Sequence, residues 1–173
     1  MPSPAGSSVR FRRVPAGLRR AAIERFARTL QKDVAKGQAF DILITGDAEL
    51  RRLNRDFCGQ DYATDVLSFP TAGQAKACPT NARVGHALTC QRPLAGVPAP
   101  FLGDIAISLG RARAQAREFG HTIEQEVQIL MLHGVLHLCG HDHESDSGAM
   151  ARAEKRWRAK LGLPNGLIER VRP

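Results

Sequence analysis

The sequence predicts a single-domain α/β protein (α+β layered), in which about five helices pack against a mixed sheet of about four strands. Its 173 residues are 43% hydrophobic and 24% charged, a composition typical of one globular domain with a buried core. Short runs rich in β-branched and aromatic residues alternate with longer segments of helical periodicity. Two of these short runs, residues 64–69 and 103–107, are candidates for neighbouring strands.

The N-terminal part of the chain contains two predicted strands and two predicted helices. Residues 9–14 permit a short edge strand, and residues 40–45 form an apolar strand. Apolar residues recur at helical spacing over residues 18–35. A further helix follows Gly46 and Asp47, which are expected to supply a turn and an N-cap. This helix directs three apolar side chains inward: Leu50, Leu53 and Phe57.

The middle of the chain contains two more predicted strands, residues 64–69 and 103–107. Residues 71–100 between them are rich in Ala, Gly, Pro and Thr and show no sustained period. Because structureless connections of this length are uncommon in compact domains, we expect a mobile inserted loop that could serve as a lid. Ser108 is predicted to cap a helix that ends at Gly120.

Two helices are predicted to complete the domain. Thr122 and Gln125 match a capping box, so a helix is expected to begin there and to bury its apolar residues. The last helix covers about residues 145–161 and is ended by Gly162. Its apolar stripe includes Trp157, which is therefore expected in the core rather than on a base-stacking surface.

Three histidines after Gln125 are spaced as metal ligands. If the segment is helical, His133 and His137 lie about 6 Å apart along the axis and about 40° apart around it, so one cation can bridge them. Gly140 can adopt the left-handed conformation that ends a helix, which allows the chain to return His143 to the same ion. Three imidazoles would leave the fourth position of a tetrahedral zinc ion for water, as in catalytic sites.

The same histidine spacing occurs in the metalloprotease motif H-E-x-x-H-x-x-G-x-x-H. Gly134 stands at the position of the glutamate that acts as general base in those enzymes, which disfavours protease chemistry. His141 is an alternative third ligand. The longer offset of His143 leaves more room for the chain to reverse after Gly140, so His143 is favoured.

The histidine segment resembles the signature of the YbeY family, zinc-dependent endoribonucleases of ribosomal RNA maturation. Three further stretches resemble that family in their residues and in their order along the chain: 54–57 with 64–70, then 102–108, then 114–121. The resemblance covers roughly Phe40 to Gly162. It implies one zinc ion on His133, His137 and His143, and cleavage of single-stranded regions of ribosomal RNA.

Charge and composition agree with a polyanionic partner in the cytoplasm. The net charge is +8, and basic side chains concentrate in residues 1–36 and 151–173. No run approaches the length of a membrane span, and four irregularly spaced cysteines are expected to be free thiols. The candidate RNA-binding residues are arginines on two predicted helices: Arg19, Arg20, Arg25, Arg28, Arg51 and Arg52.

The pattern of the YbeY family places an arginine after the aromatic residue of the stretch that ends here at Phe57, where this chain has Cys58. A guanidinium can stabilise charge that develops on a phosphodiester, which an uncharged thiol cannot do. Arg55 lies about one helical turn earlier and is a candidate substitute. Asp142 is a candidate to orient a histidine ligand, although an exposed turn carboxylate is an equal alternative.

The sequence thus predicts a hydrolase, a metal-dependent endoribonuclease formed by a single catalytic domain over residues 1–173. The resemblance implies that its partners are ribosomal RNA and ribosomal subunits, in rRNA maturation and ribosome quality control. The nucleophile is left open, because zinc can lower the pKa of a water ligand to about 7 or act as a Lewis acid on a phosphoryl oxygen. The alternative is a non-catalytic ribosome-assembly or RNA-binding factor with a structural zinc site.

Overall fold

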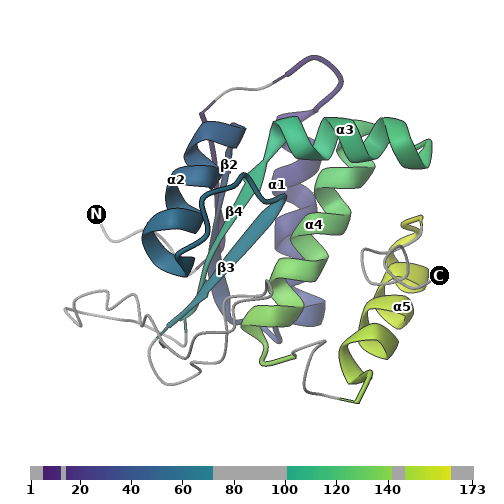
Figure 1. Cartoon of the computed structure of the whole chain (residues 1–173). Helices are drawn as coiled ribbons and strands as arrows, with labels where there is room; N and C mark the ends of the chain where they lie inside the picture. Colours follow the sequence, from purple (N-terminus) through teal and green to yellow (C-terminus); the bar gives the residue numbers. More distant parts are fainter. Residues whose placement is uncertain (1–5, 13–14, 72–100, 142–146, 165–173) are drawn as a thin grey trace.

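A mixed four-stranded sheet forms the centre of the computed structural model, which describes residues 6–12, 15–71, 101–141 and 147–164 (Figure 1). The strands are β1 (Ser8–Phe11), β2 (Ala39–Thr45), β3 (Val66–Pro70) and β4 (Phe101–Ser108). Their order is β1-β2-β4-β3. The first three in that order run parallel, and β3 pairs antiparallel with β4. The predicted mixed sheet and the predicted pairing of 64–69 with 103–107 are confirmed.

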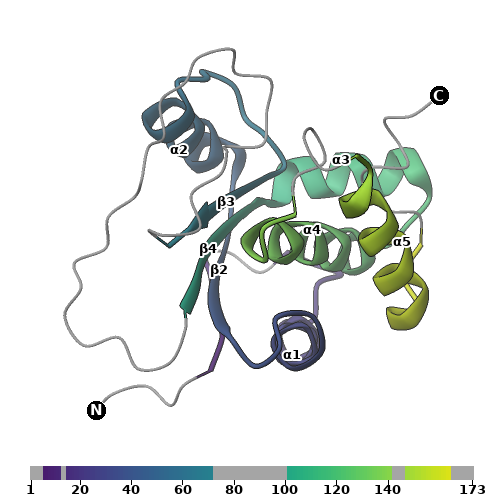
Figure 2. The same ribbon diagram turned by 90° about the horizontal axis from the view of Figure 1, so that it is seen from below.

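Five α-helices accompany the sheet in the described part of the chain. They are α1 (Arg20–Thr29), α2 (Asp47–Cys58), α3 (Leu109–Phe119), α4 (Ile123–Leu138) and α5 (Ala149–Leu161). Figure 2 shows α2 on one face of the sheet and α1 and α4 on the other, with α3 and α5 beside α4. The predicted layered α/β class is therefore correct.

The two faces of the sheet bury separate apolar clusters. Between α2 and the sheet, Leu50 packs with Leu67 and Ala106. The larger cluster lies on the opposite face, where Ile105 and Ile107 of β4 pack in one cluster with the apolar residues of α4. Because α4 lies between the sheet and α5, eleven of its sixteen residues are buried. The helix that carries the histidines is therefore held rigidly.

Several element boundaries differ from the sequence prediction. The predicted helix over 18–35 ends as α-helix at Thr29 and continues as a π-helical turn, η1 (Leu30–Val34). The N-cap of α2 is Gly46, whereas the predicted cap, Asp47, is the first helical residue and its carboxylate accepts a hydrogen bond from Ser108 Oγ. Helix α5 begins at Ala149, later than predicted. Trp157 is half-buried and packs against the core, as predicted. The expected mobile loop, 71–100, lies outside the described residues except for Thr71.

Candidate metal centre

Helix α4 carries two of the three histidines that the sequence singles out. Its N-terminus has the predicted capping box, in which the Thr122 hydroxyl accepts from the Gln125 N–H and Gln125 Oε1 accepts from the Thr122 N–H. Beyond its C-terminus, Gly140 has a φ of 91°, the left-handed conformation expected of it. Between these limits, His133 and His137 lie one turn apart on a regular helix.

The imidazole rings of His133 and His137 face each other. Their Nε2 atoms are 3.1 Å apart, and their ring centroids are 4.7 Å apart. Two nitrogens bound to one tetrahedral zinc ion at about 2.0–2.1 Å would lie about 3.3 Å from each other. His133 is only 5% exposed, so the packing of α4 holds its ring in place. The pair therefore fits two ligands of a single zinc ion with little adjustment.

Glu154 of α5 contacts the other nitrogen of the His133 ring. Its Oε2 lies 3.0 Å from His133 Nδ1, and its side chain is almost completely buried. This residue was not among those predicted from the sequence. The sequence does contain a pattern that could have predicted its burial. Glu154 follows Met150 by four residues and precedes Leu161 by seven, so it lies on the apolar stripe of α5. A carboxylate on such a stripe must be buried, and a buried carboxylate needs a polar partner.

The third ligand cannot be located among the described residues. His143, the predicted ligand, and Asp142 both lie outside them. The alternative ligand, His141, is half-buried, and its backbone N–H donates to the carbonyl of Leu136. Cys139 is a half-buried free thiol whose pKa is raised by burial, which disfavours the thiolate that a metal requires. In the described part of the chain, no group of three metal ligands is complete.

Gly134 packs against the sheet at the position where metalloproteases have their general base. A Cβ atom built on Gly134 would lie 2.9 Å from Ile105 Cγ2. The Gly134 carbonyl also accepts a hydrogen bond from Ser68 Oγ of β3 at 3.4 Å. A side chain here would therefore meet β4, so a general base could be placed there only if the helix moved away from the sheet.

Comparisons with known proteins agree with these features of the sequence and fold. The family model described as "Endoribonuclease YbeY" matches residues 13–162. The chain belongs to the YbeY family. The Endoribonuclease YbeY of Solibacter usitatus (strain Ellin6076) is 68% identical over 171 residues, which cover 99% of each chain. That of Koribacter versatilis (strain Ellin345) is 40% identical over 156 residues, which cover 90% of this chain and 86% of the relative.

A solved structure also resembles this member of the YbeY family. The solution structure of TM1509 from Thermotoga maritima matches it with a TM-score of 0.52 and 25% sequence identity. The match covers 88% of this chain and 93% of the other. The family that the histidine segment suggested is therefore confirmed by the family model and the relatives, and the solved structure shows a similar fold.

Cys58, which stands where the family resemblance implied an arginine, is disulfide-bonded. The prediction that all four cysteines are free thiols is therefore wrong at Cys58, although Cys139 is free. The error has a simple physical origin, since spacing along the chain does not reveal which thiols the fold brings together.

Arg55, the candidate substitute for the family arginine, lies on α2. Its side chain is 57% exposed, and its Nε lies 3.5 Å from Asp56 Oδ1. Helix α2 covers the face of the sheet opposite to α4 (Figure 2). Strand β3 forms one edge of the sheet. Arg55 could therefore act on a substrate bound at the histidines only if that substrate extended around this edge to the other face.

Most of the predicted RNA-binding arginines are engaged in ion pairs. Four of them contact carboxylates at 2.8–3.1 Å: Arg19 with Glu124, Arg20 with Glu24, Arg51 with Asp61, and Arg52 with Glu49. Within the described residues, Arg25 and Arg28 form no ion pair. These two are accordingly the most available of the six for phosphate groups.

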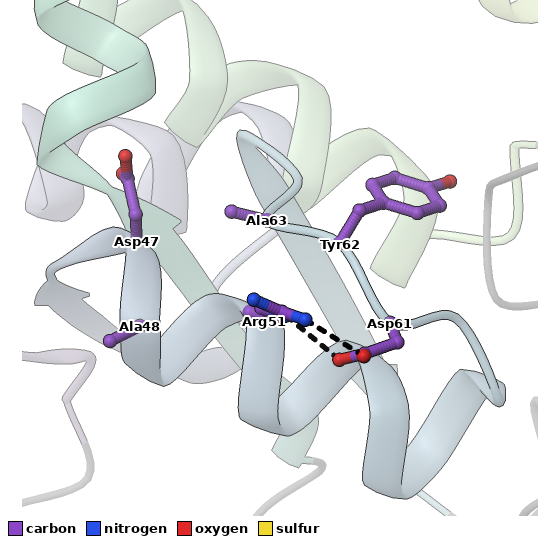
Figure 3. Close-up of a pocket in the computed structure, with 6 residues that line it drawn as sticks. All are labelled: Asp47, Ala48, Arg51, Asp61, Tyr62 and Ala63. Carbon is purple, nitrogen blue, oxygen red and sulfur yellow. Dashed lines mark hydrogen bonds and ion pairs between the residues drawn. The ribbon is translucent and has the colours of Figure 1, made fainter.

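A shallow surface pocket of about 450 Å³ lies along α2 and the segment that leads to β3 (Figure 3). Arg51 and Asp61 form a bidentate ion pair in this pocket, with both N–O distances at 2.8 Å. The exposed Tyr62 side chain stands beside them. The pocket belongs to α2, on the opposite face of the sheet from α4, so it is separate from the histidine pair.

No helix in the described ranges combines the length and the apolar composition that a membrane crossing requires.

Proposed function

We propose that this protein is a zinc-dependent endoribonuclease that cleaves single-stranded regions of ribosomal RNA during rRNA maturation and ribosome quality control in the cytoplasm. Endoribonuclease activity is supported by the family and by relatives of that name, one of them 68% identical. The observation that carries the proposal for zinc is the pair of Nε2 atoms on His133 and His137, 3.1 Å apart on a buried helix. Ribosomal RNA and ribosomal subunits are the proposed partners.

Each part of the site has a proposed role. His133, His137 and His143 hold the ion, and Asp142 orients a ligand through a hydrogen bond. When bound, zinc supplies Lewis-acid stabilisation to a phosphoryl oxygen and raises the acidity of a coordinated water. The six arginines bind the RNA backbone through its phosphates, independently of sequence: Arg19, Arg20, Arg25, Arg28, Arg51 and Arg52.

The main test combines metal analysis with cleavage of single-stranded RNA by the wild type and by His137→Ala. We expect the wild type to contain about one zinc ion per chain and the variant to lose both zinc and cleavage. His121→Ala is the matched control, because His121 lies before the first residue of α4, and that residue, Ile123, is already about 15 Å from His133 along the helix axis. If zinc is present but wild type and His137→Ala cleave equally, the protein is instead a ribosome-assembly factor with a structural zinc site.

The third ligand is tested by comparing His143→Ala with His141→Ala. We expect the first variant to lose zinc and the second to retain it. The opposite result would identify His141 as the ligand.

Arg55 is proposed to supply the cation that Cys58 cannot. If so, Arg55→Ala should lose most RNA cleavage, whereas Cys58→Arg should change it little. Cys58→Ser is the control for loss of the disulfide, and zinc content should be unchanged in all three variants. If Cys58→Arg strongly raises cleavage and Arg55→Ala has no effect, Arg55 does not substitute for the family arginine.

A further inference from the structure

We propose that Glu154 is a positioning residue, which holds the His133 ring in the tautomer and orientation that expose Nε2 to the metal. The inference rests on the proposed zinc site and adds a residue to it from a different helix. Its basis is the contact of 3.0 Å between Glu154 Oε2 and His133 Nδ1, both on almost completely buried side chains.

The direction of this hydrogen bond follows from the chemistry of the two groups. A carboxylate can only accept, so the proton of the contact belongs to His133 Nδ1. With the proton on Nδ1, the lone pair of the neutral ring is on Nε2. That atom is the one that faces His137 Nε2 at 3.1 Å. Glu154 thus selects the tautomer in which His133 can be a ligand.

Burial makes this selection strong. His133 is 5% exposed and Glu154 is 2% exposed, so water cannot readily replace either partner. If the ring turned over, the buried carboxylate would lose its hydrogen bond from Nδ1, which is costly. The contact also links two helices, since His133 lies on α4 and Glu154 on α5 (Figure 1). Residues outside the ligand set that orient ligands in this way typically raise metal affinity about 10–100-fold.

The first test needs only the metal-free wild-type protein. Two-bond ¹H–¹⁵N correlation spectra identify which imidazole nitrogen carries the proton. We expect the His133 signals of the tautomer protonated at Nδ1. Signals of the tautomer protonated at Nε2 would overturn the inference.

The second test measures zinc affinity by competition with a chromophoric chelator, and ligand geometry from the absorption bands of bound Co²⁺. Glu154→Gln preserves the size of the side chain, but its amide can either donate or accept, so it no longer dictates the tautomer. We expect zinc to bind about 10–100-fold more weakly and the Co²⁺ bands to shift.

Glu126→Gln is the matched control, because Glu126 is also a fully buried glutamate, and it lies 3.5 Å from His121 Nδ1. Circular dichroism should show that both variants remain folded. Unchanged zinc affinity in Glu154→Gln, with a wild type that binds zinc, would overturn this inference alone. A wild type that binds no zinc would overturn the proposed zinc site and this inference with it.

Discussion

At the scale of single residues, Gly134 combines a packing role with a chemical consequence. Because glycine has no side chain, α4 can approach β4 closely at Ile105. This close approach sets the distance between the histidines and the sheet. The same absence removes the general base of the metalloprotease motif. The chemical consequence follows from the sequence alone, whereas the packing role depends on which strand lies under the helix.

Gly134→Ala should destabilise the protein even though alanine is the better helix former. The gain in helix propensity is about 1 kcal/mol, whereas overpacking in a core typically costs about 1–3 kcal/mol. The free energy of unfolding from urea titration should therefore fall in this variant. In an Ile105→Ala background the same change should cost less, because the atoms that clash are gone. An equal cost in both backgrounds would show that Ile105 is not what excludes the side chain.

At the scale of elements, the helices are joined by a few polar contacts as well as by apolar packing. Arg19, just before α1, donates to both carboxylate oxygens of Glu124 in the first turn of α4. The hydrogen bond from Arg19 lowers the pKa of Glu124. The position of Glu124 near the helix N-terminus also favours its negative charge.

The Arg19–Glu124 pair should make stability depend on pH. Because the folded-state pKa of Glu124 is lowered, its contribution is present above the unfolded-state pKa of about 4.3 and is lost as pH falls through the folded-state value. Arg19→Ala should therefore be less stable than wild type at pH 7, by a small amount because Arg19 is exposed. The two proteins should converge near pH 2 in denaturant titrations. Arg28→Ala, which removes the same charge without breaking an ion pair between described residues, should show no such pH dependence.

At the scale of the whole molecule, local features were predictable and long-range ones were not. The capping box at Thr122, the Ser108 cap and the helix ends at Gly120 and Gly162 depend on neighbouring residues, so the sequence predicts them correctly. The strand order, the contact of Glu154 with His133 and the disulfide of Cys58 join distant segments. Spacing of the histidines predicted that His133 and His137 would meet, since a helix alone brings them together.

The RNA-binding surface should be dominated by the arginines that are not already neutralised. Each phosphate contact with a single strand contributes about 0.7 to the slope of log affinity against log salt. Replacing Arg25 and Arg28 by glutamine should lower that slope by about 1.4 for single-stranded RNA. The same change at Arg51 and Arg52, which are paired with carboxylates, should lower it less. If the second pair has the larger effect, the RNA lies along α2 instead.

The protein should still fold when residues 72–100 are replaced by a short turn. The ends of this segment already meet, because the Thr71 N–H donates to the Leu102 carbonyl at 3.0 Å and the Thr71 hydroxyl donates to the Phe101 carbonyl at 2.8 Å. A glycine-containing hairpin turn can join such ends. We expect cooperative thermal unfolding and unchanged zinc affinity, with Cys58→Ser as the control for the lost disulfide. Loss of folding beyond that of Cys58→Ser would show that the segment contributes to the core.

The parallel pairing of β2 with β4 also determines when this protein can fold during its own synthesis. The ribosome completes β2 at Thr45, but β4 begins only at Phe101, so several seconds pass at roughly 5–20 residues per second. Until then, the nascent chain holds β2 with one open edge and with the apolar side chains of Ile42 and Ile44 uncovered. This interval is when the chain is most exposed to aggregation and most in need of chaperones.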